Sequence, residues 1–214
     1  LVELMEQRVQ LAEDDQENLQ LLTSIAGLQE QSLKDPAATL DTVWRIHGVE
    51  EGNVKHLKKI QILAEHTERW DDLARALTAE VELVESPAEK LRAREKLLVI
   101  QQEKLNAFTE ALETVDAILV DHPEHVATLR RQVDLLVATA QPERAADAMD
   151  VLVGRLPDKE KPAALGRLAE VCRTELHDVS RAADALQRAL QIDATDEAVR
   201  EELHKMFEEL GRFN

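Results

Sequence analysis

The sequence predicts an all-helical protein in which antiparallel helical hairpins stack into an α-solenoid of about twelve helices. Three observations lead to this prediction: a composition of helix-forming residues, an apolar pattern that recurs at a nearly fixed spacing, and short segments that look like helix caps between the repeats.

The composition favours helices with an aliphatic core. Hydrophobic residues make up 44% of the 214 residues but aromatic residues only 2%, and there is no tyrosine. Six glycines and six prolines are few for a chain with many turns between strands. Ala, Leu, Glu, Gln, Lys and Arg dominate, and all of them are good helix formers.

An apolar pattern recurs in the second helix of each predicted hairpin and ends at an acidic or prolyl corner, as in the run from Ala111 through Val115 and Ile118 to Pro123. Successive copies begin 34, 38, 34 and 37 residues apart. Three or four extra residues add about one helical turn, so the buried face keeps its phase. The first residues of the copies are Thr39, Leu73, Ala111, Ala145 and Ala182.

Helix starts are marked by "KDPA", "SPAE", "DHPE", "QPER", "LPDKE" and "HDVS". Proline just inside a helix, after Asp or Ser, suits a first turn whose N–H groups have no partner within the helix. We therefore predict one array over 1–214, cut from a longer solenoid. Its parts are a second helix at 1–15, hairpins at 16–51, 52–86, 87–123, 124–157 and 158–194, and a first helix at 195–214.

Several segments resemble the tetratricopeptide repeat, a 34-residue helix–turn–helix unit. "AFTEALETVDAILVDHP" and "RAADALQRALQIDATD" are similar to its second helix, and "LGRFN" and "TERWDD" to its turn. The repeats are degenerate, because the first-helix motif survives mainly as Gly27. The resemblance implies a right-handed superhelix whose first helices line a concave groove. Armadillo and HEAT units are longer, and pentatricopeptide repeats bind RNA, which the acidic charge opposes.

Four consecutive predicted first helices carry a cation at the same groove-facing site: Lys58, Lys96, Arg130 and Arg167. One turn later stand mostly aliphatic residues, among them Ile62 and Ile100. A basic row beside an aliphatic row suits an acidic, amphipathic peptide or helix. The alternative is an ordinary solvated helix face, in which Arg130 pairs with Asp134 at i,i+4.

The formal charge of −17 makes nucleic acid and anionic membranes unsuitable partners. No apolar run approaches the roughly 18 residues needed to span a bilayer. A single cysteine, Cys172, excludes an internal disulfide and indicates a reducing compartment, from which we predict a cytoplasmic location. Cys172 stands at an apolar helical spacing, where we expect a buried thiol and not a reactive one.

Histidines gather at two predicted interhelix corners, "DHPEH" and "HGVEEGNVKH". Zinc requires three or four convergent ligands, whereas Asp, His and Asn at corners commonly serve as caps. We therefore predict no metal site and no cofactor. The residues at these corners are Asp121, His122, His125, His47, Glu51 and His56.

The chain carries no nucleophile, phosphate-loop or metalloprotease motif. Trp70 and Phe108 share the turn site with Phe213, which indicates packing between helices. The sequence thus predicts a non-enzymatic scaffold that docks a partner protein or peptide in the groove. Two alternatives remain: a spacer or self-association arm that dimerises through exposed solenoid ends, and a regulatory module for a catalytic domain outside this fragment.

Overall fold

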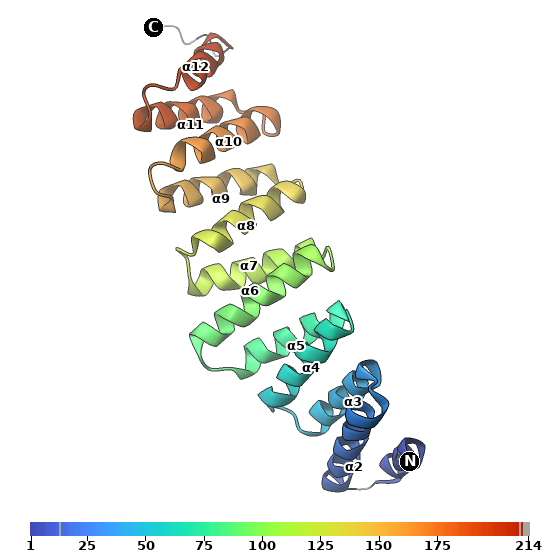
Figure 1. Ribbon diagram of the computed structural model, residues 1–214. Helices are drawn as coiled ribbons and strands as arrows, with labels where there is room; N and C mark the ends of the chain where they lie inside the picture. The colour runs from blue at the N-terminus through green and yellow to red at the C-terminus, as the bar shows by residue number, and fades with distance from the viewer. Residues whose placement is uncertain (13, 210, 212–214) are drawn as a thin grey trace. The chain divides into compact units, whose positions relative to one another are not determined.

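The computed structural model describes residues 1–12, 14–209 and 211. Within these residues the chain forms twelve α-helices and one π-helical segment, and no strand (Figure 1). The predicted fold class and number of helices are therefore confirmed. The chain divides into two compact units, Leu1–Ala107 and Phe108–Asn214. The predicted turn residue Phe213 lies outside the described residues.

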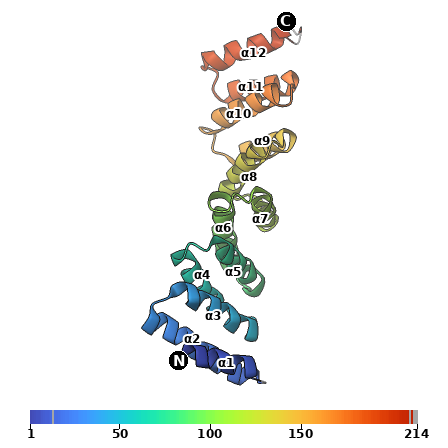
Figure 2. The same ribbon diagram turned by 90° about the vertical axis from the view of Figure 1, so that its right-hand side faces the viewer.

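The described residues of the first unit form six α-helices, and consecutive helices within the unit pack together (Figures 1 and 2). The even-numbered helices are the first helices of the predicted hairpins, and the odd-numbered ones are the second helices. They are α1 (Val2–Leu11), α2 (Asp15–Leu28), the π-helical segment η1 (Gln29–Leu33), α3 (Pro36–Val49), α4 (Val54–His66), α5 (Trp70–Leu83) and α6 (Pro87–Glu103).

The second unit repeats this arrangement, again with consecutive helices packed together and with the same assignment of first and second helices. Its helices are α7 (Phe108–Asp121), α8 (Val126–Ala138), α9 (Pro142–Arg155), α10 (Lys161–Thr174), α11 (Val179–Ile192) and α12 (Glu197–Glu209).

A residue in the left-handed backbone region follows every first helix, with φ between 51° and 63°. These residues are 34, 38, 34, 37 and 34 positions apart, which is the spacing predicted from the apolar pattern. A left-handed residue ends a helix because the next N–H can then bond back to a carbonyl of the last turn. The bond from Gln141 N–H to the Leu136 carbonyl, 2.9 Å, is one case. The residues are Lys34, Glu68, Asn106, Ala140, His177 and Gly211.

Several predicted helix starts are capped by a side chain. The carboxylate of Asp35 accepts a hydrogen bond from the Ala38 N–H at 3.0 Å, and Pro36 is the first helical residue. Asp178 accepts from the Arg181 N–H at 2.9 Å. Such caps satisfy N–H groups that the helix itself leaves unpaired.

The core of each unit is aliphatic. In the first unit Leu40, Leu57, Ile60 and Leu73 are fully buried. A buried polar pair also lies there: the Thr42 hydroxyl donates to the Gln29 side-chain oxygen at 2.7 Å, across α3 and η1. A hydrogen bond of this kind compensates two polar groups for their loss of water.

In the second unit alanines occupy many of the buried positions. Ala111, Ala145 and Ala182, which begin three copies of the apolar pattern, are fully buried. Cys172 is also 0% exposed, and burial raises the pKa of its thiol. The expectation of a buried thiol is therefore confirmed.

Helix α1 differs from the other second helices in having no buried residue. Leu1, Leu4 and Leu11 are 79%, 65% and 79% exposed. In α5, by contrast, Leu73 and Ala76 are fully buried, because α5 packs against both α4 and α6.

Candidate functional site

The four cations of the predicted basic row lie on the first helices α4, α6, α8 and α10. Each forms an ion pair with a carboxylate from another helix or from the residue preceding one. Their side chains are between 38% and 56% exposed. The pairs are Lys58–Glu80 (2.5 Å), Lys96–Glu65 (2.7 Å), Arg130–Glu160 (2.5 Å) and Arg167–Asp134 (2.9 Å).

The local pair considered for Arg130 and Asp134 is not the one that forms. Asp134 on α8 accepts from Arg167 on α10, and Arg130 on α8 donates to Glu160 at the start of α10. The two arginines therefore tie neighbouring first helices together, in opposite directions. A row of cations on one helix face forms such bridges only when the neighbouring helix has carboxylates beside them. The residue spacing within one helix does not show where those carboxylates lie.

The two isoleucines of the predicted aliphatic row are placed differently. Ile62 on α4 is 67% exposed, as expected for a residue that lines an open face. Ile100 on α6 is only 7% exposed and belongs to the core of the first unit with Leu73 and Leu77. Its expected position on an exposed row is corrected: the end of α6 is covered by core packing, to which Leu105 in the following turn also contributes.

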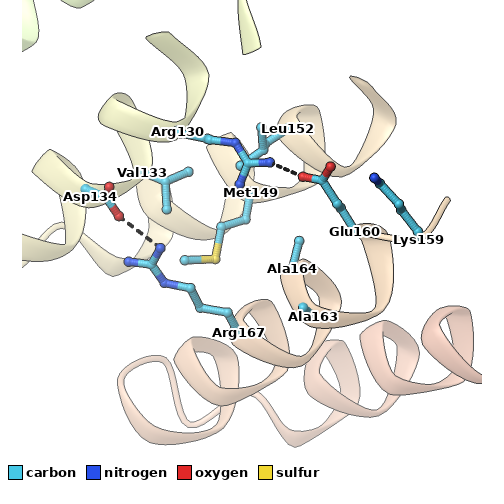
Figure 3. A pocket seen from close by; sticks show the side chains of 10 residues that line it. All are labelled: Arg130, Val133, Asp134, Met149, Leu152, Lys159, Glu160, Ala163, Ala164 and Arg167. Carbon is cyan, nitrogen blue, oxygen red and sulfur yellow. Dashed lines mark hydrogen bonds and ion pairs between the residues drawn. The ribbon is translucent and has the colours of Figure 1, made fainter. Parts of the chain in front are cut away.

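In the second unit, Arg130 and Arg167 border a hollow of about 400 Å³ between α8, α9 and α10 (Figure 3). Its floor is apolar, formed by Val133, Met149 and Leu152, of which Met149 lies between the two arginines in Figure 3. The two ion pairs described above frame this floor. The full lining comprises Arg130, Val133, Asp134, Met149, Leu152, Lys159, Glu160, Ala163, Ala164 and Arg167.

In the first unit, Lys58 and Lys96 border a second hollow, of about 240 Å³, between α4, α5 and α6. Its floor is partly polar, because Gln61 and Glu80 are buried there, with 5% and 3% exposure. One Glu80 carboxylate oxygen accepts from Lys58 Nζ and the other from Gln61 Nε2, each at 2.5 Å. The full lining comprises Lys58, Gln61, Leu77, Glu80, Glu89, Arg92, Ala93 and Lys96.

The two hollows occupy corresponding places in the repeats. Aligned by the repeat spacing, each residue that lines the smaller hollow has a counterpart in the larger one. Two cations, one glutamate and one alanine of the smaller hollow have counterparts of the same kind in the larger hollow. The floors differ, because the polar pair Gln61 and Glu80 stands where the larger hollow has the apolar pair Val133 and Leu152. The remaining counterparts are Lys58 and Arg130, Leu77 and Met149, Glu89 and Glu160, Arg92 and Ala163, Ala93 and Ala164, and Lys96 and Arg167.

Gln61 and Glu80 are not among the site residues predicted from the sequence. A signal was present, since Glu80 falls where the other copies of the pattern carry Ile46, Ile118, Leu152 or Ala189. A carboxylate at a core position has to be paired when it is buried.

A second cluster of charges lies on the second helices of the second unit, away from the hollow. Asp150 on α9 accepts from Arg188 and Arg181 on α11 at 2.6 and 2.9 Å. Burial opposes ionisation of this carboxyl group, but the two arginines outweigh it, so the pKa of Asp150 is lowered. This cluster links α9 to α11.

The described residues contain no group of three or more His, Cys, Asp or Glu side chains that could hold a metal ion. His56 lies 3.4 Å from the Glu50 carboxylate, and its ring centroid is 6.5 Å from that of His47. His125, just before α8, lies 2.7 Å from the Thr128 hydroxyl.

The tryptophans of the first unit pack beside cations. The guanidinium of Arg75 lies 3.5 Å from the ring centroid of Trp44, and Lys104 Nζ lies 4.8 Å from that of Trp70. Both rings also pack against the core of the unit, which places Trp70 where the repeat predicted it. Among the helices of the described residues, none combines the length and the hydropathy that a membrane crossing needs.

Comparison with known protein families and with curated proteins found no match. Solved structures do match. The chain superimposes over 99% of its length on 33% of a chain in the structure of Naa15/Naa10 bound to HypK-THB, with a TM-score of 0.63 and 15% identity.

Two further matches have lower scores. YrrB, described as a TPR protein with an unusual peptide-binding site, has a TM-score of 0.48 at 11% identity, over 86% of this chain and 91% of that chain. MamA from Desulfovibrio magneticus RS-1 has a TM-score of 0.46 at 14% identity, over 84% and 97%. At these identities the likeness concerns the fold alone. With its helical hairpins and its repeat spacing, the chain has the fold of the tetratricopeptide-repeat proteins, in a degenerate form.

Proposed function

We propose that this chain is a protein-binding scaffold whose first-helix faces dock an acidic, amphipathic segment of a partner protein. The observation that carries the proposal is the hollow between α8, α9 and α10, in which an apolar floor is framed by two arginines. A concave, mostly apolar site with a few fixed polar groups is the usual form of a binding pocket.

The charges of this hollow favour an acidic partner over a basic one. Its lining holds three cations, Arg130, Lys159 and Arg167, against the two acids Asp134 and Glu160. In a chain of formal charge −17 this is a local excess of positive charge. Complementary charge at a rim raises the rate of association and selects among partners, while the buried centre provides most of the affinity.

The arginines are also held in place before any partner arrives. Each is engaged by a carboxylate of the neighbouring first helix, at 2.5 and 2.9 Å. Long basic side chains otherwise lose rotamer entropy when they are immobilised on binding, so an ordered rim lowers the cost of association.

The test uses random 15-residue peptides displayed on phage and selected on the full chain. Affinities of the recovered peptides are then measured by fluorescence polarisation at two salt concentrations. In the test variant Lys58, Lys96, Arg130 and Arg167 are all changed to Gln. Substitution to Gln avoids placing a second acid beside the buried Glu80.

A matched control changes four cations outside the two hollows to Gln: Lys55, Lys59, Arg144 and Arg155. We expect peptides rich in Asp, Glu and aliphatic residues, at least tenfold weaker binding to the test variant, and weaker binding at high salt. Circular dichroism checks that both variants keep their helices. Equal binding to the test and control variants would remove these faces as the docking site.

A further inference from the structure

The buried carboxylate of Glu80 has no structural counterpart among the other repeats. Its position on α5 is 3% exposed, and the equivalent residues Ile46, Ile118, Leu152 and Ala189 are buried as well. An aliphatic residue would therefore suffice for packing. Replacing a buried ion pair by well-packed apolar residues is often neutral or stabilising, so stability alone does not account for a glutamate here.

Glu80 instead fixes the polar character of the smaller hollow. Gln61 donates to one carboxylate oxygen and Lys58 to the other. The carboxylate is covered, but the Lys58 side chain remains 56% exposed at the mouth of the hollow. Glu80 and Gln61 thus hold the ammonium group of Lys58 toward the solvent side of the site.

An entering side chain meets mainly cations at this hollow. Lys58 and Arg92 are exposed, Lys96 is 38% exposed, and Glu89 is the exposed acid of the lining. A carboxylate could accept charge-assisted hydrogen bonds from these groups. An aliphatic side chain would cover the polar pair and strip water from Lys58 without offering a hydrogen bond, which is unfavourable.

We infer that the floor pair of each hollow selects its anchor: the hollow of α4, α5 and α6 takes an aspartate or glutamate side chain of the partner, and the hollow of α8, α9 and α10 takes an aliphatic one. This inference rests on the proposed function and deepens it, because it assigns the two properties of the partner to two different places. Glu80 and Gln61 are positioning residues in this scheme, since they act through Lys58.

The test again uses peptides selected on the full chain. Each peptide is assigned to a hollow by the methyl NMR signals that it shifts, Leu77 and Ala93 for one hollow and Val133, Met149 and Leu152 for the other. We expect that changing the anchor Asp or Glu to Asn or Gln weakens peptides of the first group at least tenfold. Peptides of the second group should instead lose affinity when Leu, Ile or Val is changed to Ala.

The decisive variant is Gln61→Val/Glu80→Leu, which gives the smaller hollow the floor of the larger one. We expect acidic peptides to lose at least tenfold in affinity for it, and peptides with aliphatic anchors to begin to shift the Leu77 and Ala93 signals. A purely structural role of Glu80 would not exchange one preference for the other. The control variant, Gln29→Leu/Thr42→Val, removes another buried polar pair of the same unit and should leave both preferences unchanged.

The possible outcomes separate the two proposals. If no peptide is recovered on the wild-type chain, the proposed function fails. If peptides bind but none shifts Leu77 and Ala93, or if their preference survives Gln61→Val/Glu80→Leu, the assignment of anchors is overturned while the scaffold role stands.

Discussion

The two hollows lie at corresponding positions in the repeats, but the residues of their floors differ. Between α8, α9 and α10 the floor consists of Val133, Met149 and Leu152, whereas between α4, α5 and α6 it contains the hydrogen-bonded pair Gln61 and Glu80. The linings hold equal numbers of charges, three cations and two acids each, but one acid of the smaller hollow, Glu80, is buried in its floor. A repeat architecture can thus keep the position of a site and change the chemistry of its floor with two substitutions, because each repeat packs mainly on its neighbours.

The largest effect should come from placing the glutamate in the other floor. Leu152→Glu puts a carboxylate where Val133 supplies no hydrogen-bond donor and where Arg130 is already engaged by Glu160. We expect a loss of about 3 kcal/mol or more in the free energy of unfolding, since a buried charge without adequate partners is costly. Urea unfolding followed by circular dichroism measures it.

The neighbouring substitution Val151→Glu is the control, because Val151 is 50% exposed and should change stability by less than about 0.5 kcal/mol. In the reverse direction, Gln61→Val/Glu80→Leu should leave stability unchanged or raise it. If Leu152→Glu lowers the free energy of unfolding no more than Val151→Glu does, the floor of the larger hollow is not the apolar environment described above.

A smaller effect should be common to both units and concerns the left-handed residues after the first helices. Glu68 and Ala140 occupy equivalent turns with φ of 55° and 51°, where a side chain is strained and glycine is not. Glu68→Gly and Ala140→Gly should each stabilise the chain, by about 0.5–1 kcal/mol, after the greater flexibility of glycine in the unfolded chain is deducted.

Urea midpoints measure this effect as well. Asn106→Gly should raise the free energy of unfolding by less, because asparagine tolerates this backbone conformation better than most other residues do. A destabilising Ala140→Gly would mean that the turn does not follow the repeat.

Most of the fold could be predicted from the sequence, because periodicity alone specifies it. The apolar pattern from Thr39 to Ala182 set the spacing that the left-handed residues then followed in the structure. Helix starts such as Asp35-Pro36 were also readable, since a cap acts within four residues of chain.

The site could be predicted only in part. Four cations were placed on the correct helices, but the carboxylates that engage them come from other helices, at distances along the chain that no single-helix pattern encodes. Ile62 and Ile100 illustrate the limit: both follow a row cation by four residues, yet one is exposed and the other buried. Residues four apart on a helix differ by about 40° in direction, so the tilt of the neighbouring helix decides which of them is covered.

The smallest effect concerns pH and distinguishes the units by their titrating groups. Burial lowers the pKa of His56 in the first unit, and nearby His47 acts in the same direction, against an opposing contribution from Glu50. In the unfolded chain His56 therefore takes up a proton near pH 6.5, whereas in the folded chain it does so only at lower pH. The contribution of neutral His56 to the free energy of unfolding is complete above pH 6.5. It is lost as the pH falls from the pKa of His56 in the unfolded chain to its lower pKa in the folded chain.

Both tryptophans, Trp44 and Trp70, belong to the first unit, so tryptophan fluorescence reports its unfolding selectively. We expect the urea midpoint to fall between pH 7.5 and pH 5.5 and to fall less in His56→Gln. The net charge of the whole chain is less negative at pH 5.5, and this affects the wild type and His56→Gln equally. The difference between their changes in urea midpoint therefore reports the contribution of His56. Asp150→Asn should not alter this difference, because the lowered pKa of Asp150 keeps that carboxyl group ionised throughout the interval. An equal fall in His56→Gln would place the titrating group elsewhere in the first unit.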